Sequence, residues 1–288
     1  MAGIRIEDIT KKYGDTVALD HISMSFEENR IYGLLGRNGA GKSTLLNIIS
    51  DRIIADSGSV LVDEEAVRDN DKMLSRIYSM NDRMYYPGSM KVKDAFRWSG
   101  EFYRDFDADY AKKLAKRFRL DTEKPVQALS TGYASIFKII IALSVNTPYV
   151  LFDEPVHGLD INHRDLFYRL LLEKYSEQPF TAVVSTHIID EIAHLFEDII
   201  IMKSGRVIES CSCEELVSGA YAVSGPEASV DTYAAGLDVL GTERLGQLKT
   251  VYIRGEAQTG RLSADLEISR ANLQKLFIQM TSEEEELA

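Results

Sequence analysis

The sequence predicts an α/β domain built on a largely parallel sheet, followed by a small α+β domain. Between residues 31 and 210, short apolar runs of strand type alternate with helical segments, which is the pattern of a parallel sheet covered by helices. A glycine-rich segment joins one of these strands to the helix that follows it. Beyond about residue 220, short segments of alternating apolar and polar residues replace this pattern and indicate a separate unit.

The first domain opens with short strands within residues 3–35, where residues 22–26 alternate with period two and residues 31–35 form a continuous apolar run. After the glycine-rich segment, leucines and isoleucines recur at helical spacing. Further elements follow from the same two periodicities. The expected helices are residues 92–120, 131–145, 161–175 and 188–196, and the expected strands are residues 149–152, 181–185, 198–203 and 206–210.

The last part of the chain differs in charge as well as in pattern. From residue 213 to the end there are 13 Asp and Glu residues against 6 Lys and Arg, a net charge of −7 that leaves −5 for the residues before it. We therefore expect a main domain at residues 1–212 and a small accessory domain at residues 213–288.

Two segments suggest the structure of the accessory domain. Residues 249–254 alternate as a strand does, and an apolar stripe of Leu273, Phe277 and Met280 predicts a final helix with Ser269 as its N-cap. Because so short a striped helix must pack on something, we expect a dimer contact or a regulatory role, with a passive structural cap as the alternative.

Composition excludes several classes of function. The net charge of −12 over 288 residues argues against a nucleic-acid binder, which needs a basic face. No run approaches the roughly 18–20 apolar residues of a membrane helix, and the N-terminus lacks the pattern of a signal peptide. The two cysteines, Cys211 and Cys213, are too few for a disulfide scaffold. We expect a cytoplasmic protein.

The glycine-rich segment fits the pattern G-x-x-x-x-G-K-[ST], which holds phosphates. Its glycines allow successive backbone N–H groups to face phosphate oxygens, and the following helix directs its positive end at the same anion. Lys42 could reach the β- and γ-phosphates, and the Ser43 hydroxyl could coordinate Mg²⁺. The segment lies between an expected strand and an expected helix, as the pattern requires. It reads Gly36-Arg37-Asn38-Gly39-Ala40-Gly41-Lys42-Ser43-Thr44.

A pair of carboxylates follows the apolar strand at residues 149–152. Ligands bind at the carboxyl ends of strands in sheets of this kind, so we expect Asp153 to hold Mg²⁺, directly or through water. Glu154 points elsewhere and could accept a proton from an attacking water. An isolated Asp-Glu pair is usually an ordinary solvated turn, but its combination with the phosphate-binding segment favours a nucleotide site.

A further motif distinguishes the kind of nucleotide site. The segment Leu129-Ser130-Thr131-Gly132-Tyr133 opens an expected helix shortly before the strand that ends in Asp153. It resembles the signature motif of the ATP-binding subunits of ABC transporters, and the resemblance extends over about residues 3–212. This family resemblance implies a P-loop NTPase fold of the ABC ATPase type, with a helical subdomain at about residues 83–146.

The resemblance also implies roles for residues in other matching motifs. Tyr13 is similar to the aromatic residue that stacks on adenine. Asp160, in His157-Gly158-Leu159-Asp160, is similar to the acidic residue of the D-loop. His187, at the end of an expected strand, is similar to the histidine that contacts the γ-phosphate.

In this family the signature motif acts in trans, so Ser130 and Gly132 would contact ATP held by the P-loop of a second subunit. The resemblance therefore implies ATP and Mg²⁺ as cofactors and a dimer, either a homodimer or a heterodimer with a related chain. It also implies a transmembrane permease as partner, which would hold the chain at the inner face of the cell membrane.

The sequence departs from the family pattern at two places. Thr131 and Tyr133 replace the usual Gly and Gln of the signature motif, and Asp82 stands where a loop Gln normally contacts Mg²⁺. Asp82 could still be a metal ligand, or its loop could have lost that role. These departures favour an exporter-type member.

Two alternatives compete with an ATPase subunit that powers a separate permease. One is an ABC-type ATPase with a soluble task, but such members usually carry two domains in one chain or long coiled-coil insertions. The other is a catalytically silent subunit, which the set of Lys42, Asp153, Glu154 and His187 disfavours.

Overall fold

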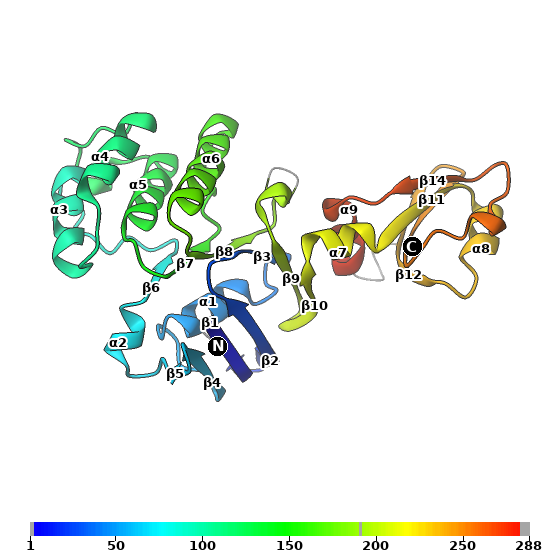
Figure 1. Ribbon diagram of the computed structural model, residues 1–288, viewed down its shortest axis with the longest axis horizontal. Coiled ribbons are helices and arrows are strands. Elements are labelled where there is room, and N and C mark those ends of the chain that lie inside the picture. The colour runs from blue at the N-terminus through cyan, green and yellow to red at the C-terminus, as the bar shows by residue number, and fades with distance from the viewer. Residues whose placement is uncertain (1–2, 190–191, 283–288) are drawn as a thin grey trace.

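The computed structural model of the protein describes residues 3–189 and 192–282 and contains three sheets (Figure 1). The mixed α/β fold confirms the predicted fold class. Its strands are β1 (Gly3–Tyr13), β2 (Thr16–Glu27), β3 (Ile31–Leu35), β4 (Ser57–Val62), β5 (Glu65–Ala66), β6 (Ile77–Met80), β7 (Tyr149–Asp153), β8 (Thr181–Thr186), β9 (Asp198–Lys203), β10 (Arg206–Ser212), β11 (Ala220–Pro226), β12 (Asp238–Leu245), β13 (Leu248–Arg254) and β14 (Glu267–Arg270). Its α-helices are α1 (Lys42–Ile49), α2 (Asp71–Leu74), α3 (Val92–Phe102), α4 (Ala108–Arg117), α5 (Thr131–Ser144), α6 (Ile161–Glu177), α7 (Cys213–Ser218), α8 (Glu227–Ala234) and α9 (Leu273–Thr281).

The central sheet has six strands in the order β10-β9-β3-β8-β7-β6. All neighbouring strands are parallel except β10 and β9, so the predicted parallel sheet is confirmed. The register pairs Leu35 with Thr186 and Asp153 with Ser185. The carboxyl ends of β3, β7 and β8 therefore meet at one edge of the sheet.

Helix α1 lies between the central sheet and an antiparallel sheet of order β2-β1-β4-β5. Its buried residues, such as Leu45 and Ile49, share one apolar cluster with Ile6 of β1 and Leu151 of β7. This packing on two sides fixes the start of α1, and with it the glycine-rich segment, against the end of β3.

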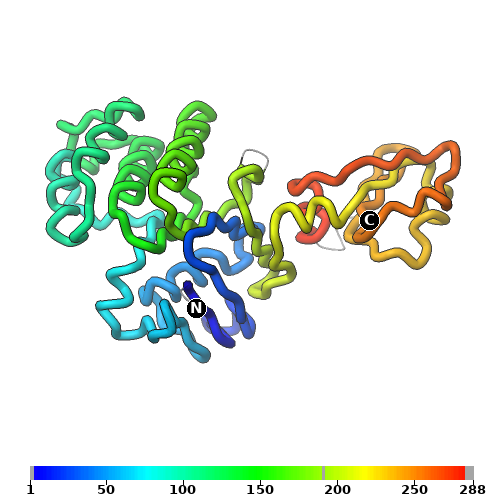
Figure 2. The backbone as a smooth tube through the Cα atoms, in the orientation of Figure 1, coloured from blue at the N-terminus to red at the C-terminus, as the bar shows by residue number. Residues whose placement is uncertain are grey.

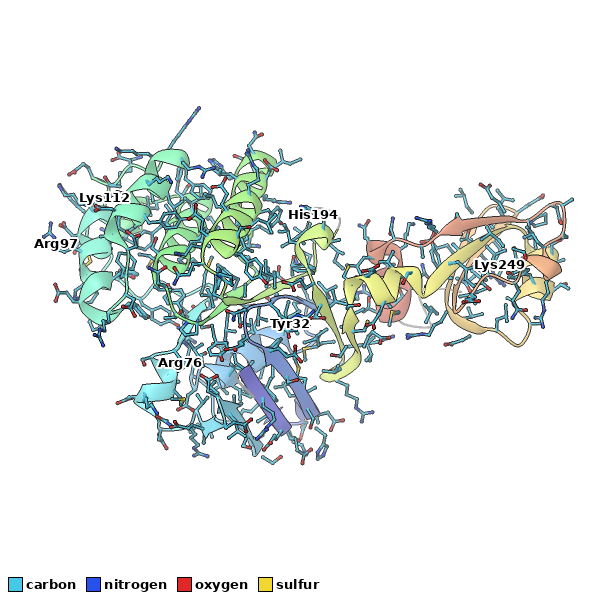
Figure 3. All side chains as sticks on the ribbon, in the orientation of Figure 1. Tyr32, Arg76, Arg97, Lys112, His194 and Lys249 are labelled. Carbon is cyan, nitrogen blue, oxygen red and sulfur yellow. The ribbon has the colours of Figure 1, made fainter. Side chains whose placement is uncertain are left out.

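Helices α3 to α6 form a layer around the opposite apolar cluster of the central sheet (Figure 1). The continuous helix expected at residues 92–120 is instead two helices, because the Asp107 side chain accepts a hydrogen bond from the Tyr110 N–H and caps α4. Arg97 and Lys112 extend from the outer side of this layer (Figure 3). No helix within the described residues has the length and apolar character needed to cross a membrane.

The prediction of a helix over residues 188–196 is wrong for the part that the structure describes, with residues 190 and 191 lying outside it. Among the described residues of this segment, only a 3-10 turn forms, at Ala193–Leu195. The Ile188 N–H bonds the side chain of Thr186. The apolar spacing reflects burial of Ile189, Ile192 and Leu195 rather than helix formation.

The third sheet lies in the C-terminal region and has the order β12-β13-β11-β14. It extends away from the rest of the molecule (Figure 2). The predicted final helix is present as α9, but Ser269 does not cap it: Ser269 lies in β14 opposite Ala222. The cap is Asn272, whose side chain accepts a hydrogen bond from the Lys275 N–H.

Helix α9 connects this third sheet to the central sheet. Leu273, Leu276 and Phe277 are buried in the same apolar cluster as residues of β9. On the other side, Glu243 of β12 accepts hydrogen bonds from Lys275 and Gln279 of α9. The C-terminal region therefore shares its core with the main part of the chain.

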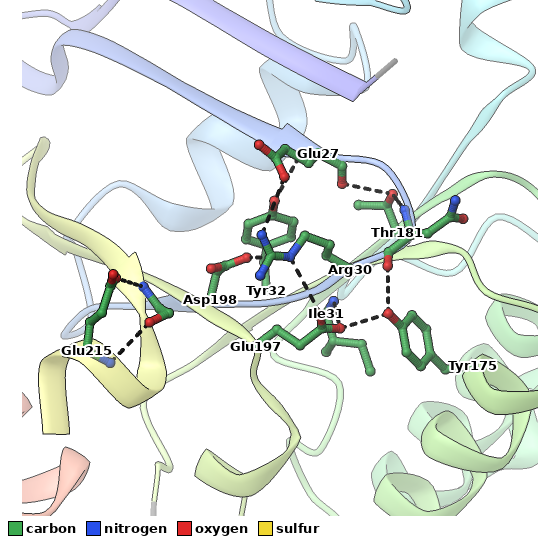
Figure 4. Close-up of polar contacts among 11 residues, drawn as sticks. Glu27, Arg30, Ile31, Tyr32, Tyr175, Thr181, Glu197, Asp198 and Glu215 are labelled. Carbon is green, nitrogen blue, oxygen red and sulfur yellow. Dashed lines mark hydrogen bonds and ion pairs between the residues drawn. The ribbon is translucent and has the colours of Figure 1, made fainter. Parts of the chain in front are cut away.

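A group of charged and hydroxyl side chains links the amino ends of β3 and β9 (Figure 4). The Arg30 Nε lies 2.9 Å from Asp198 Oδ2 and 3.5 Å from Glu197 Oε2. Burial raises the pKa of Asp198, with Arg30 acting in the opposite direction. The Tyr175 hydroxyl of α6 donates a hydrogen bond to Glu197, at 2.8 Å. These contacts hold β9 in place beside β3.

The shared core predicts that Leu276→Ala lowers the free energy of unfolding of the whole chain by about 2–5 kcal/mol, as expected for a cavity in a packed core. Leu276 is fully buried. Urea denaturation would measure the change, with the exposed Ile278→Ala on the same helix as the control. A loss below about 1 kcal/mol would contradict the packing of α9 on the common core.

Candidate functional site

The glycine-rich segment leaves β3 and turns tightly into α1. Gly39 and Gly41 have φ values of 84° and 104°, which favour glycine. A Cβ at Gly41 would lie 2.6 Å from the Ala18 carbonyl oxygen, so this position also requires close approach of the backbone. The Lys42 side chain, only 6% exposed, donates a hydrogen bond to the Gly36 carbonyl at 2.6 Å.

Asp153, at the end of β7, is the centre of a hydrogen-bonded group. Its Oδ1 accepts hydrogen bonds from the Ser43 hydroxyl at 3.0 Å and from the Ser185 hydroxyl at 2.7 Å. The Ser185 Oγ in turn accepts a hydrogen bond from the Glu154 N–H at 3.0 Å. Three segments distant in the sequence are thus joined through one carboxylate oxygen.

Glu154 has an unusual backbone for a residue other than glycine, with φ of 46°. Such strained conformations are held by their surroundings and are frequent at functional sites. In this conformation its carboxylate contacts the side chains of His187 and Lys42. Glu154 Oε2 lies 3.0 Å from His187 Nδ1, and Oε1 lies 3.5 Å from Lys42 Nζ.

The segment after β6 brings Asp82 to the same side of the sheet. Asp82 is exposed and lines a cleft of about 730 Å³ together with Ser43, Asp153 and Glu154. Lys138 of α5 donates hydrogen bonds to the carbonyls of Asn81 and Asp82, at 2.8 and 3.1 Å. Burial lowers the pKa of Lys138, with the charges of Asp82 and Asp153 opposing that shift.

The donor set in this cleft fits a hard divalent cation. Ser43 and Asp153 offer oxygen atoms that already lie 3.0 Å apart, and Mg²⁺ prefers oxygen ligands with few contributed by the protein. Within residues 3–189 and 192–282, no group of three or more His, Cys, Asp or Glu forms an all-protein metal site.

The signature residues lie at the start of α5. Ser130 is exposed and is the N-cap of this helix, its hydroxyl accepting a hydrogen bond from the Tyr133 N–H. Gly132 faces the loop between β7 and α6, where a Cβ would lie 2.7 Å from the Gly158 carbonyl oxygen. The described hydrogen bonds of Ser130 stay within its own helix.

The described side-chain contacts of Tyr13 and Asp160 do not join either residue to the group around Asp153. Tyr13 ends β1, is 48% exposed, and has Lys11 Nζ 5.6 Å from its ring centroid. Asp160 is exposed and caps α6, accepting a hydrogen bond from the His163 N–H. That hydrogen bond lowers the pKa of the Asp160 carboxyl. The roles expected for both residues stay predictions.

Sequence comparisons identify the family. The family model described as ABC transporter matches residues 19–157. An uncharacterized ABC transporter ATP-binding protein of Methanocaldococcus jannaschii is 30% identical over 218 residues, which cover 74% of this chain and 79% of the relative. The chain belongs to the ABC transporter ATP-binding proteins. The ABC transporter ATP-binding protein YtrB of Bacillus subtilis is 26% identical over 213 residues, covering 74% and 73% of the two chains.

Solved structures agree with this family. A dimeric structure of a bacterial ABC transporter cassette has a TM-score of 0.65 and 25% identity, covering 73% of this chain and 98% of the cassette. A nucleotide-free ATP-binding cassette has a TM-score of 0.63 and 23% identity, covering 75% and 94% of the two chains. As a member of this family, the chain is the ATP-binding and ATP-hydrolysing subunit of a transporter.

Two side chains at the site of this ABC ATP-binding protein do not belong to any of the motifs that the sequence shows. Lys138 is the only charged residue of α5, and a lone cation among buried isoleucines indicates a specific polar partner. Ser185 is the last residue of the strand expected at residues 181–185. Its hydroxyl contacts follow from the register of β7 and β8, which the sequence alone does not show.

The position of Ser185 predicts that Ser185→Ala lowers kcat roughly 10- to 100-fold, the equivalent of one charge-assisted hydrogen bond. ATP affinity should change little, because Ser185 contacts the two acidic residues rather than the P-loop. Steady-state ATPase assays and calorimetric titration would separate the two effects. The control is Ser144→Ala, which removes a buried hydroxyl that has no hydrogen-bond partner among the described residues. Equal kcat values for the two variants would contradict the prediction.

Proposed function

We propose that this chain powers a separately encoded membrane permease by closing with ATP into a head-to-tail dimer. The observation that carries the proposal is the joining of Ser43, Asp153, Ser185, Glu154 and His187 at one edge of the central sheet. The parts that phosphoryl transfer to water requires are present there: a phosphate-binding segment, two acidic residues with different environments and a histidine.

Each part has a distinct task in this proposal. The backbone N–H groups of residues 36–44 bind the phosphates, and Lys42 neutralises charge on the β- and γ-phosphates. Glu154 accepts the proton of the attacking water. His187, 3.0 Å from Glu154 Oε2, orients that carboxylate and contacts the γ-phosphate. Tyr13 stacks on the adenine ring.

Mg²⁺ is the proposed metal, held by Ser43 and Asp153 with Asp82 as a third candidate. When bound, it would neutralise charge that develops on the phosphate oxygens. The Ser185 hydroxyl keeps Asp153 Oδ1 facing Ser43. Asp82 would add a negative charge to this cleft, so its contribution is smaller than that of Asp153 or is made through water.

The dimer is proposed on two grounds. Ser130 is exposed at the start of α5. Its described hydrogen bonds are with residues of its own helix and not with the P-loop. One solved relative, 25% identical with a TM-score of 0.65, is a dimeric cassette in a post-hydrolysis state bound to ADP and phosphate. In our proposal Ser130 and Gly132 contact ATP on a second subunit, either an identical chain or a related one.

Export is the proposed direction of transport, and the chain acts at the inner face of the membrane through its permease. Relatives of both kinds match: the bacitracin transport ATP-binding protein BcrA of Bacillus licheniformis is 26% identical, and the petrobactin import ATP-binding protein YclP of Bacillus subtilis is 25% identical. The first match covers 74% of this chain and 71% of the relative, and the second covers 81% and 98%. The departures at Thr131, Tyr133 and Asp82 favour export.

We expect Glu154→Gln to bind ATP but to hydrolyse it about 10²–10⁴-fold more slowly, which is the usual contribution of a positioned general base. The variant should accumulate as an ATP-bound dimer on size exclusion. The companion variant Lys42→Ala should lose ATP binding, because the phosphates lose their main cationic contact. Wild-type turnover in Glu154→Gln would remove Glu154 from this role.

The trans contact of the signature motif is tested best at Thr131. A side chain at Gly132 would collide with the Gly158 carbonyl, whereas Thr131 is exposed and an Asp in the first turn of a helix is favourable. Thr131→Asp should keep ATP binding by the single chain. It should lose dimerisation and hydrolysis together, because like charges about 4 Å apart repel by about 4 kcal/mol at an effective dielectric near 20.

Thr131→Asn is the matched control, since it has nearly the same shape without the charge. ATP-dependent dimerisation would be measured by analytical ultracentrifugation in a Glu154→Gln background. Equal dimerisation of the Asp and Asn variants would refute the contact between the signature motif and the phosphates of a second subunit.

A further inference from the structure

Helix α9 forms one wall of a cavity whose other wall is the phosphate-binding segment. The cavity has a volume of about 480 Å³. On one side lie Arg37, Asn38 and His187, and on the other lie Phe277, Ile278 and Thr281 of α9. The C-terminal region, which supplies none of the proposed ATP-site residues, thus reaches the ATP site from the side.

The α9 wall is firmly held. Lys203, at the end of β9, donates hydrogen bonds to the carbonyls of Met280 and Ser282, at 3.3 and 2.7 Å. Phe277 and Thr281 are buried, which leaves little freedom for the C-terminal turn of the helix. A rigid wall of this kind can contribute to recognition without an ordering cost on binding.

The exposed part of this wall is apolar. Ile278 is 39% exposed and is the one large apolar side chain of α9 that solvent reaches to this extent. Beside it, Arg37 and Asn38 are exposed at the tip of the phosphate-binding segment. An apolar centre with polar neighbours is the usual composition of a surface that binds another protein.

We propose that this wall belongs to the dimer face, and that a second copy of this chain covers Ile278 when ATP closes the dimer. The inference rests on the proposed head-to-tail dimer and extends it, because it gives the C-terminal region a direct part in closure. The cavity is continuous with that face, since it shares Arg37, Asn38 and His187 with the site that the second copy must cover.

The surface that the second copy would offer is also suitable. Residues 126–133, which lead into and include the signature motif, contain no charged residue in a chain that is 27% charged. Gln127 and Ala128 are exposed within this segment. An uncharged segment can cover an exposed isoleucine without leaving a charge unpaired in the contact.

The test compares two isoleucines of equal exposure in the full-length chain. Ile278→Glu is introduced into the Glu154→Gln background, and Ile208→Glu serves as the control because Ile208, on β10, is also 39% exposed. We expect Ile278→Glu to weaken ATP-driven dimerisation at least about tenfold, as a charge does inside a protein contact. The ATP affinity of the monomer should be unchanged, and Ile208→Glu should dimerise normally. Sedimentation and calorimetric titration give the two readouts.

Other outcomes overturn the inference. Dimerisation of Ile278→Glu within about twofold of the parent would show that the second copy does not cover α9. A loss of ATP affinity in the monomer would show that the wall contacts nucleotide of its own chain instead. If Glu154→Gln itself forms no ATP-driven dimer, the head-to-tail homodimer is refuted and the inference falls with it, while a head-to-tail dimer with a related chain is not tested by this result. Should Ile278→Glu lower the melting temperature, Ile278→Lys, which also places a charge in the contact, replaces it with the same criteria.

Discussion

The parallel register of β3, β7 and β8 is the constraint on which the rest of the site depends. It places Asp153 beside Ser185 and Leu35 beside Thr186. The three strands therefore end at the same level, and the residues that follow them lie close together. The Ser185 hydroxyl then donates a hydrogen bond to the Asp153 carboxylate and accepts one from the Glu154 backbone N–H, which ties the ends of β7 and β8 together. A slip of one strand by one residue would turn these side chains to the opposite face.

The fold could be predicted because its strongest signals are local. Apolar runs such as residues 149–152 and 181–185 are short, continuous and bounded, and they form strands β7 and β8. The P-loop is predictable for a similar reason, since glycine positions and a lysine at fixed spacing encode one backbone shape. The start of α4 at Asp107 is predictable from the residue type. Aspartate is a preferred N-cap residue, because its side chain accepts a hydrogen bond from the N–H three residues later.

What could not be predicted depends on how distant segments meet. The helix expected at residues 188–196 was wrong because burial of apolar residues on a folded core imitates helical spacing. The partners of Ser185 and Lys138 come from strand register and helix packing, which no single segment contains. The approach of α9 to the phosphate-binding segment depends on Lys203 and on a core that the C-terminal sheet shares with β9.

The contact between Lys138 and the segment after β6 has a consequence for how this protein can change in sequence. Lys138 holds the carbonyl oxygens of Asn81 and Asp82, which every amino acid possesses. Helix α5 and this segment therefore stay tethered whatever side chain occupies position 82. Substitution there can adjust the chemistry of the cleft while the mechanical link between the helical layer and the sheet persists.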